Sequence, residues 1–373
     1  MEKQTQTFQR LQSLDTFRGF DMFFIMGGNA FFVALATLIP LPFFQAIAGQ
    51  MEHVEWNGLA MEDMIFPTFL FIAGISFPYS LAKQRAKGMS SAAIYKKLIR
   101  RGLTLVVLGI IYNGLFSTWD FATARYGSVL GRIGLAWMFG ALIFVNTKTI
   151  TRVWITAALL IGYWLLLNFV PAPDANGADR FSMQGCLVGY VDRVCMPGHL
   201  YKEIHDPEGL LGTIPAIGTA LLGMFTGEFV RLQREKLTGC RKVIYMLICG
   251  AAFILLGILW NQVFPFNKNI WSSSFVCTVG GISMMLFAIF YYIVDVKNYH
   301  RWTLFFRVIG MNSITIYLAQ RFIDFQYSTH EIFDGLANLS PATLAPMVLA
   351  IGYIALCWLF LYFLYRQKIF LKV

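Results

Sequence analysis

Apolar runs of about 20 residues recur along the whole chain, and each is long enough for a helix to cross the ~30 Å hydrocarbon core of a bilayer. Hydrophobic residues make up 57% of the 373 residues and charged residues 13%. Soluble chains carry roughly 25% charged residues. A soluble protein of this length cannot bury so much apolar surface, so the sequence predicts an all-α, polytopic membrane protein.

Ten membrane-spanning helices are expected from the hydrophobic pattern. They are predicted at residues 17–38, 60–82, 99–117, 128–146, 151–171, 209–230, 242–263, 270–294, 303–323 and 343–365. Neither an internal repeat nor a linker divides the chain, which disfavours a transporter built from inverted repeats. Residues 1–373 are therefore expected to form a single membrane domain. Because the first residues do not resemble a cleavable signal peptide, the first helix is expected to stay in the mature protein.

The loops that connect these helices differ in positive charge. The loops on the side of the N-terminus carry Lys83, Arg85, Lys87, Lys96, Lys97, Arg100, Arg101, Lys148, Arg152, Arg231, Arg234, Lys236, Arg241, Lys242, Lys297 and Arg301, and the C-terminal tail adds Arg366, Lys368 and Lys372. The opposite loops carry only Arg125, Arg180, Arg193, Lys202 and Lys268, with Arg321 at a border. The positive-inside rule therefore predicts that both termini are cytoplasmic. We interpret the net charge of +10 mainly in this way, with no nucleic-acid partner; an anionic cofactor at the basic loops is the alternative.

Two external loops are long, at about residues 39–59 and 172–208, and long loops often carry binding residues. Cys186 and Cys195 both fall in the second loop, where a disulfide and two free thiols are both open. No spacing of cysteine and histidine indicates a metal site.

The first predicted helix has polar side chains near both of its ends. Asp15 and Arg18 are three positions apart and share a helix face, so a structural ion pair is expected, with a phosphate contact by Arg18 as the alternative. Asn29 lies near the outer end of this apolar helix, where an unpaired amide is costly. We therefore expect Asn29 to face the interior of the bundle.

The first external loop holds the best candidate base, His53, since histidine alone has an ordinary pKa near neutrality and a nearby carboxylate can orient it. A solvated loop histidine is the alternative. Trp56 beside Asn57 suits a sugar ring and a membrane interface equally well.

Further polar side chains occur in the second external loop and at membrane depth. The loop carries the carboxylates Asp192, Asp206 and Glu208, which suit an ammonium ion or sugar hydroxyls, or are simply solvated. The groups at membrane depth are Arg132, Trp271, Asn312, Ser313 and Gln320, and such groups line a cavity or pair between helices.

Several separate stretches follow one another in the order of a known family. They are SLDTFRG at 13–19, Asn29, HVEWNGLAMED at 53–63 with FPTFLFIAG after it, GRIG at 131–134, GYVDR at 189–193, DPEGLLGT at 206–213, NIWSSSFV at 269–276, GMNSITIY at 310–317 and the terminal KIFLKV. In these stretches the chain resembles the heparan-alpha-glucosaminide N-acetyltransferase family of transmembrane acetyltransferases.

The resemblance implies that acetyl-CoA binds from the cytoplasm and that its acetyl group passes to the amine of a glucosamine unit at an outward-facing site. The family's essential histidine falls on His53 and its active-site asparagine on Asn29. The candidate sugar-site or supporting residues are Trp56, Asn57, Asp63, Asp192, Asp206 and Glu208, and the candidates for the nucleotide end are Arg18, Arg132, Ser313 and Lys372.

His53 is then expected to remove the amine proton and Asn29 to donate to the oxyanion, with an acetyl-His53 intermediate as the alternative. The printed chain has no counterpart of the large luminal N-terminal segment of the lysosomal enzymes. We therefore expect a free or short-chain amino sugar outside a bacterial inner membrane. An O-acyltransferase of an envelope glycan and a sugar transporter are the rival functions, and a homodimer is left open.

Overall fold

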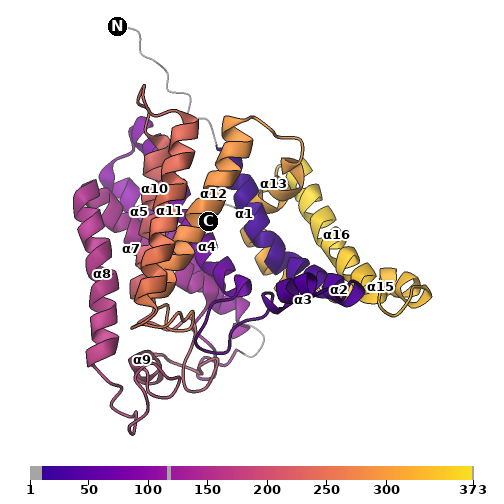
Figure 1. The fold of residues 1–373 in the computed structure, drawn as a ribbon, viewed down its shortest axis with the longest axis horizontal. Helices are drawn as coiled ribbons and strands as arrows, with labels where there is room; N and C mark the ends of the chain where they lie inside the picture. Colours follow the sequence, from indigo (N-terminus) through magenta and orange to yellow (C-terminus); the bar gives the residue numbers. More distant parts are fainter. Residues whose placement is uncertain (1–10, 116–118, 372–373) are drawn as a thin grey trace.

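The computed structural model describes residues 11–115 and 119–371, and within these ranges the chain forms helices and no strand. Eight of the helices described there are long and apolar enough to cross a membrane. They span Gln12–Leu38, Met61–Ala86, Val129–Asn146, Thr149–Phe169, Thr213–Arg231, Gly239–Trp260, Ser273–Val296 and Ala345–Arg366. The predicted polytopic helical membrane bundle is confirmed (Figure 1).

Two of the ten predicted spanning helices differ from the prediction. Helix α5 (Ser91–Tyr112) forms, but its first half carries Lys96, Lys97, Arg100 and Arg101, too many charges for a plain apolar span. The segment predicted at 303–323 is two short helices, α13 (Thr303–Met311) and α14 (Ser313–Phe322), because Asn312 leaves the helical conformation with φ −126°.

The first span is bent at its centre. It consists of α1 (Gln12–Phe23), a π-helical turn η1 (Phe24–Gly28) and α2 (Asn29–Leu38). Gly27 has φ +115°, a conformation that a residue without a Cβ adopts readily. In Figure 1, α2 turns away from the direction of α1 and runs beside α3 (Pro42–Gly49).

Three helices form the centre of the bundle: α4 (Met61–Ala86), α10 (Thr213–Arg231) and α12 (Ser273–Tyr291), whose apolar windows are 72%, 67% and 67% buried. The remaining helices are α7 (Val129–Asn146), α8 (Thr149–Phe169), α9 (Leu187–Cys195), α11 (Gly239–Trp260), η2 (Tyr292–Val296), α15 (Phe325–Leu339) and α16 (Ala345–Arg366). Only 22–28% of the windows of α8, α11 and α16 is buried, so these three helices present their apolar side chains to lipid.

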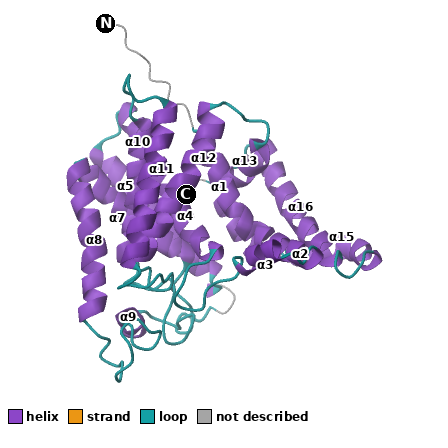
Figure 2. Ribbon diagram, in the orientation of Figure 1, coloured by secondary structure: helices purple, strands orange, loops and turns teal. Residues whose placement is uncertain are grey.

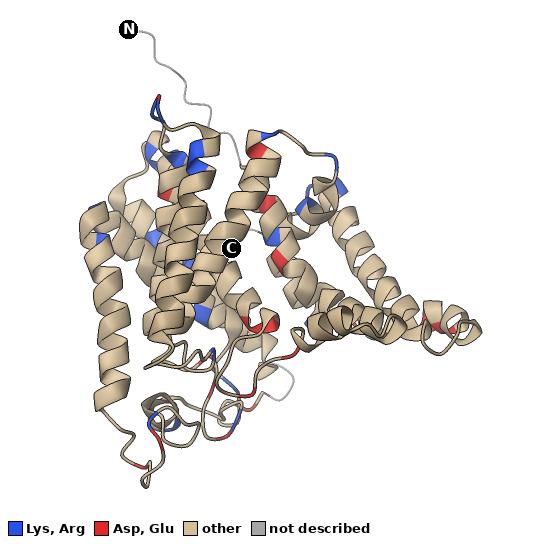
Figure 3. Cartoon of the chain, viewed as in Figure 1, with Lys and Arg blue, Asp and Glu red and all other residues tan. Residues whose placement is uncertain are grey.

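The long loops gather at one end of the bundle, around α9 (Figure 2). At the opposite end Lys and Arg cluster near the tips of the helices, whereas the loop end carries both charges (Figure 3). Cys186 and Cys195 both lie at the loop end as free thiols, one buried and one exposed. The Cys186 Sγ instead caps α9, accepting a hydrogen bond from the Gly189 N–H at 3.4 Å, so no disulfide joins the two residues.

Candidate functional site

His53 pairs with Asp63 across ten residues. The loop after α3 returns to the first turn of α4, and there the His53 Nδ1 lies 2.9 Å from the Asp63 Oδ1. The other Asp63 oxygen accepts the backbone N–H groups of Val54 and Ala60 at 3.3 and 3.2 Å, so the carboxylate is fixed. Asp63 is 3% exposed and His53 is 56% exposed. This geometry suits a base, because a carboxylate that holds Nδ1–H leaves the lone pair on Nε2 of a half-exposed ring.

Lys268 completes a group of three charged or ionisable side chains. Its Nζ lies 3.2 Å from the His53 Nδ1, 3.5 Å from the His53 Nε2 and 3.5 Å from the Asp63 Oδ1. The residue comes from the loop between α11 and α12, 215 positions away from His53. Sequence reasoning counted Lys268 only as a loop charge, and no spacing pattern could have linked it to His53.

Trp56 and Asn57 join the external loops to one another. The Trp56 Nε1 donates to the Phe181 carbonyl at 2.6 Å, and its ring meets that of His205 edge-on at 4.9 Å. The Asn57 Oδ1 accepts the Asn267 amide at 3.1 Å. Trp56 and Asn57, both predicted to contact the sugar, thus also hold the external loops together beside His53.

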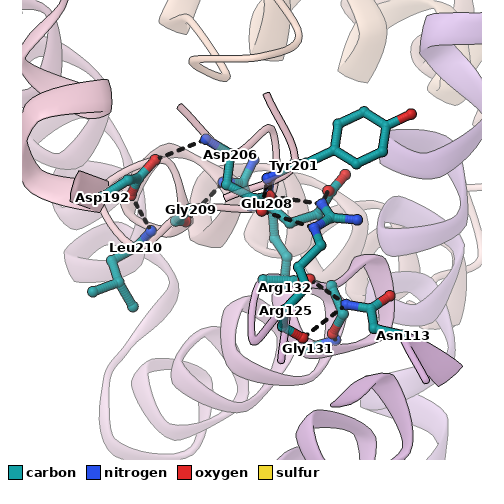
Figure 4. Close-up of polar contacts among 12 residues, drawn as sticks. Asn113, Arg125, Gly131, Arg132, Asp192, Tyr201, Asp206, Glu208, Gly209 and Leu210 are labelled. Atoms are coloured by element: carbon teal, nitrogen blue, oxygen red, sulfur yellow. Dashed lines mark hydrogen bonds and ion pairs between the residues drawn. The ribbon is translucent and has the colours of Figure 1, made fainter. Parts of the chain in front are cut away.

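Arg125, a residue that sequence reasoning also left out, holds two of the predicted carboxylates (Figure 4). Its guanidinium contacts both Asp206 oxygens at 2.8 and 2.7 Å and the Glu208 Oε2 at 2.5 Å. The Asp206 side chain is fully buried and that of Glu208 is 10% exposed. A buried carboxylate pair is tolerable here because a bidentate arginine compensates it.

Asp192 and Arg132 shape the backbone that carries Glu208 (Figure 4). The Asp192 Oδ1 accepts the Leu210 N–H at 2.9 Å, and the Arg132 Nη2 donates to the Gly209 carbonyl at 2.8 Å. A Cβ on Gly209 would lie 2.0 Å from the Asp192 Oδ2, so the DPEG turn needs this glycine. Arg132 was predicted at the nucleotide end, but the structure places it beneath the external loop.

Burial and ion pairing shift the pKa values of these loop groups in different directions. Burial raises the pKa of Asp192 to about 6 and also raises the pKa of Glu208. Burial opposes ionisation of Asp206 too, but the Arg125 hydrogen bonds and charge more than offset it and lower the pKa of Asp206. Burial lowers the pKa of His205 to about 4.

A basic cavity lies at the other end of α4. It has a volume of about 470 Å³ and is lined by Ser80, Gln84, Lys97, Arg100 and Arg101 among others. The Arg101 guanidinium lies 4.1 Å above the Trp137 ring and within electrostatic reach of Arg18. The predicted ion pair of Arg18 with Asp15 is confirmed at 3.7 Å. Such a cavity suits a polyanionic nucleotide. The sequence placed Lys97, Arg100 and Arg101 on the basic loops of the N-terminal side but did not single them out as nucleotide-site candidates.

The remaining predicted site residues lie apart from His53. Asn29 lines a separate cavity with Gln320, His330 and Tyr353, and its Oδ1 accepts the adjacent Ala30 N–H at 2.7 Å. Ser313 is buried at the break between α13 and α14, where its hydroxyl donates to the Gly310 carbonyl at 3.4 Å. Lys372 lies outside the described residues.

Comparison with known proteins agrees with the predicted resemblance. The family model "Heparan-alpha-glucosaminide N-acetyltransferase, catalytic" matches residues 10–257. The chain is 28% identical to the heparan-alpha-glucosaminide N-acetyltransferase of Homo sapiens, over 98% of this chain and 60% of that protein. The relative of the same name from Mus musculus is 27% identical, over 100% of this chain and 62% of that protein. The chain thus spans about three fifths of the length of these relatives. Since the family model covers well over half of the chain, the protein belongs to the heparan-alpha-glucosaminide N-acetyltransferase catalytic family.

Proposed function

We propose that this protein is a transmembrane N-acetyltransferase that moves the acetyl group of cytoplasmic acetyl-CoA to the amine of glucosamine or of a terminal glucosaminide. In this proposal residues 1–373 act as one acyltransferase domain in a bacterial inner membrane, with the acceptor on the periplasmic side. The family membership supports the reaction class. The separation of a basic cavity from a loop end rich in carboxylates supports the division into a donor side and an acceptor side.

The His53–Asp63 pair is the observation that carries the proposal. With Nδ1–H bound to Asp63, Nε2 keeps the lone pair that takes a proton from the acceptor amine as the nitrogen attacks the thioester carbon. The Lys268 Nζ, 3.5 Å from Nε2, must then yield its place to the amine. The C–S bond then breaks, the thiolate leaves as coenzyme A, and the amide forms. General-base assistance of this kind is commonly worth about 10²–10⁴-fold. An acetyl-His53 intermediate would use the same Nε2 as a nucleophile.

The carboxylates of the second external loop are proposed to hold the sugar. The charge of Lys268, which contacts His53, also acts on the Glu208 carboxylate, and this supports a sugar position near the His53 loop. Arg125 keeps the Glu208 carboxylate in place by a direct contact. A carboxylate at this position suits sugar hydroxyls or the ammonium form of the acceptor.

The basic cavity is proposed to hold the anionic nucleotide of acetyl-CoA. Asp63 and Ser80 are 17 positions apart on the same helix, so about 26 Å separates the cavity from the His53 pair at 1.5 Å per residue. The anionic nucleotide of acetyl-CoA would stay at the basic cavity, because a polyanion does not enter lipid unaided. The uncharged arm would therefore have to extend toward His53 inside the bundle.

Asn29 remains our candidate oxyanion donor on the strength of the family resemblance. It lines a cavity with Gln320, His330 and Tyr353, and His53 is not part of that lining. Lys268 is the cation that contacts His53 in the structure.

Two variants in one assay test the proposal. Radiolabelled acetyl-CoA and glucosamine are supplied to the purified protein in detergent, and the position of the acetyl group in the product is determined. We expect wild type to form N-acetylglucosamine and His53→Ala to bind acetyl-CoA normally but lose at least about 100-fold in turnover. Arg101→Met should do the reverse, raising the KM for acetyl-CoA several-fold with little change in kcat.

Acetyl transfer to a hydroxyl would replace the proposal with an O-acyltransferase. Absence of both turnover and acetyl-CoA binding in the wild type would rule out an acetyltransferase of any kind. Normal turnover by His53→Ala would remove His53 from the mechanism.

A further inference from the structure

We propose that Lys268 is a positioning residue that offsets the charge of Asp63 beside His53 and orients the ring as a base. This inference rests on the proposed function for its biological meaning, but its physical content concerns only three side chains. All three are close: Lys268 lies within 3.5 Å of both ring nitrogens of His53 and of the Asp63 Oδ1.

The donors and acceptors of the three groups allow few arrangements. The Asp63 carboxylate only accepts, the Lys268 ammonium only donates, and the His53 Nδ1 does one or the other. When Nδ1 carries the proton it donates to Asp63, Lys268 also donates to Asp63, and Nε2 keeps its lone pair. When Nδ1 is bare it accepts from Lys268, and Nε2 carries the proton instead. Lys268 has a hydrogen-bond partner in both neutral forms of the imidazole, but it faces a like charge when both nitrogens are protonated.

Without Lys268, Asp63 would favour the wrong protonation state. A fixed carboxylate 2.9 Å from an imidazole stabilises the imidazolium, which has no lone pair with which to accept a proton. The ammonium neutralises that carboxylate and repels the proton on the ring. Asp63 therefore orients the ring while Lys268 cancels the electrostatic cost of doing so.

The other charged groups around His53 are acidic and act in the opposite direction. Glu62, the neighbour of Asp63 in the first turn of α4, lies within electrostatic reach of both His53 and Lys268. The loop that carries His53 adds Glu52 and Glu55. Among the described residues that contact His53, Lys268 is the only cation, so its removal leaves acidic groups alone around the ring.

The side chain is also held in place. The Lys268 side chain is 17% exposed, and its loop neighbours are anchored on both sides. The Asn267 amide donates to Asn57 at 3.1 Å, and the Asn269 amide donates to the Glu55 carbonyl at 3.4 Å. These hydrogen bonds join the Lys268 loop to the His53 loop. Because they flank Lys268 on both sides, they hold its ammonium group next to the His53 ring.

The test measures the protonation of His53 without substrates. The pH dependence of modification of His53 by diethyl pyrocarbonate, which reacts with neutral imidazole, is followed by mass spectrometry in wild type, Lys268→Met and Lys268→Arg. We expect the midpoint for His53 to rise by about one pH unit in Lys268→Met and to stay near the wild-type value in Lys268→Arg, which retains the cation. Lys202→Met, the same change at an exposed position of the second external loop, should leave the midpoint unchanged.

Activity provides the second readout. The acid limb of the kcat/KM profile should shift to higher pH by the same amount in Lys268→Met, with unchanged binding of acetyl-CoA. An unchanged modification midpoint in a folded Lys268→Met protein would overturn the inference. Wild-type protein without acetyltransferase activity would count against the proposed function alone, because the modification experiment requires no turnover.

Discussion

At the scale of single residues, Asp192 and His205 have opposite effects on stability in one pH range. Burial raises the pKa of Asp192 to about 6 from an ordinary 3.8, so the folded protein holds a proton that the unfolded chain releases. The unfolding free energy from this residue therefore falls as pH rises from about 4 to about 6. Burial lowers the pKa of His205 to about 4 from an ordinary 6.5, so its contribution rises over nearly the same range.

Each contribution is about 3 kcal/mol, so the two largely cancel in the wild type. In Asp192→Asn only the contribution of His205 remains, so the protein should lose stability as pH is lowered from 6.5 to 4.5. In His205→Phe only the contribution of Asp192 remains, so stability should fall as pH is raised over that range. Thermal unfolding of the purified protein at several pH values checks both slopes, each relative to wild type. Equal slopes in the two variants would contradict the assignment.

The sequence could identify the residues of the site better than their partners. His53 and Asp63 are close in sequence, and the family motif includes both, so their pairing was within reach. Arg125 and Lys268 were missed because their contacts join residues 81 and 215 positions apart. Arg132 was predicted at the nucleotide end, whereas its guanidinium contacts the Gly209 carbonyl next to Glu208, because a buried arginine suits either a nucleotide or a loop carbonyl until the fold places it.

At the scale of elements, α4 and α10 pack through glycines. A Cβ on Gly223 would lie 2.1 Å from the Phe71 carbonyl oxygen, and one on Gly74 would lie 2.4 Å from that of Ala220. In a membrane the hydrophobic effect does not drive helices together, because lipid is as apolar as the helix surfaces. Small residues stabilise helix pairs there by letting the two backbones pack closely. This contact packs α10 directly against α4, the helix that carries Asp63.

Gly223→Val should therefore destabilise the protein by at least about 2 kcal/mol, because neither backbone can retreat without opening the core. Gly162→Val on α8 is the matched control, since nothing lies within 4 Å of its added Cβ. We expect the control to unfold within about 0.5 kcal/mol of wild type. Thermal unfolding in detergent compares the two variants, and equal melting temperatures would refute the close contact.

Two helices were predicted as continuous from their hydrophobic pattern although their backbones break. The segment from 303 to 323 is apolar enough for one helix, but the non-helical Asn312 divides it. The hydrophobic pattern predicts a continuous first span, but Gly27 bends it, and Asn29 lines a cavity whose lining does not include His53. Neither break alters the hydrophobic pattern, so the pattern could not reveal them.

At the scale of the whole molecule, the two ends of α4 have opposite characters. Lys97, Arg100 and Arg101 surround the cavity at one end, and the His53–Asp63 pair lies with the carboxylate loops at the other. The positive-inside rule predicts that the basic end faces the cytoplasm. Acetyl transfer between these ends would therefore also be transfer across the membrane.

Proteoliposomes test that claim most directly. Radiolabelled acetyl-CoA is added only outside the vesicles and glucosamine is enclosed only inside, so molecules inserted with the basic end outward have each substrate on its proposed side. We expect labelled N-acetylglucosamine inside wild-type vesicles and none in vesicles that contain His53→Ala. Product that forms only when both substrates share one compartment would contradict it.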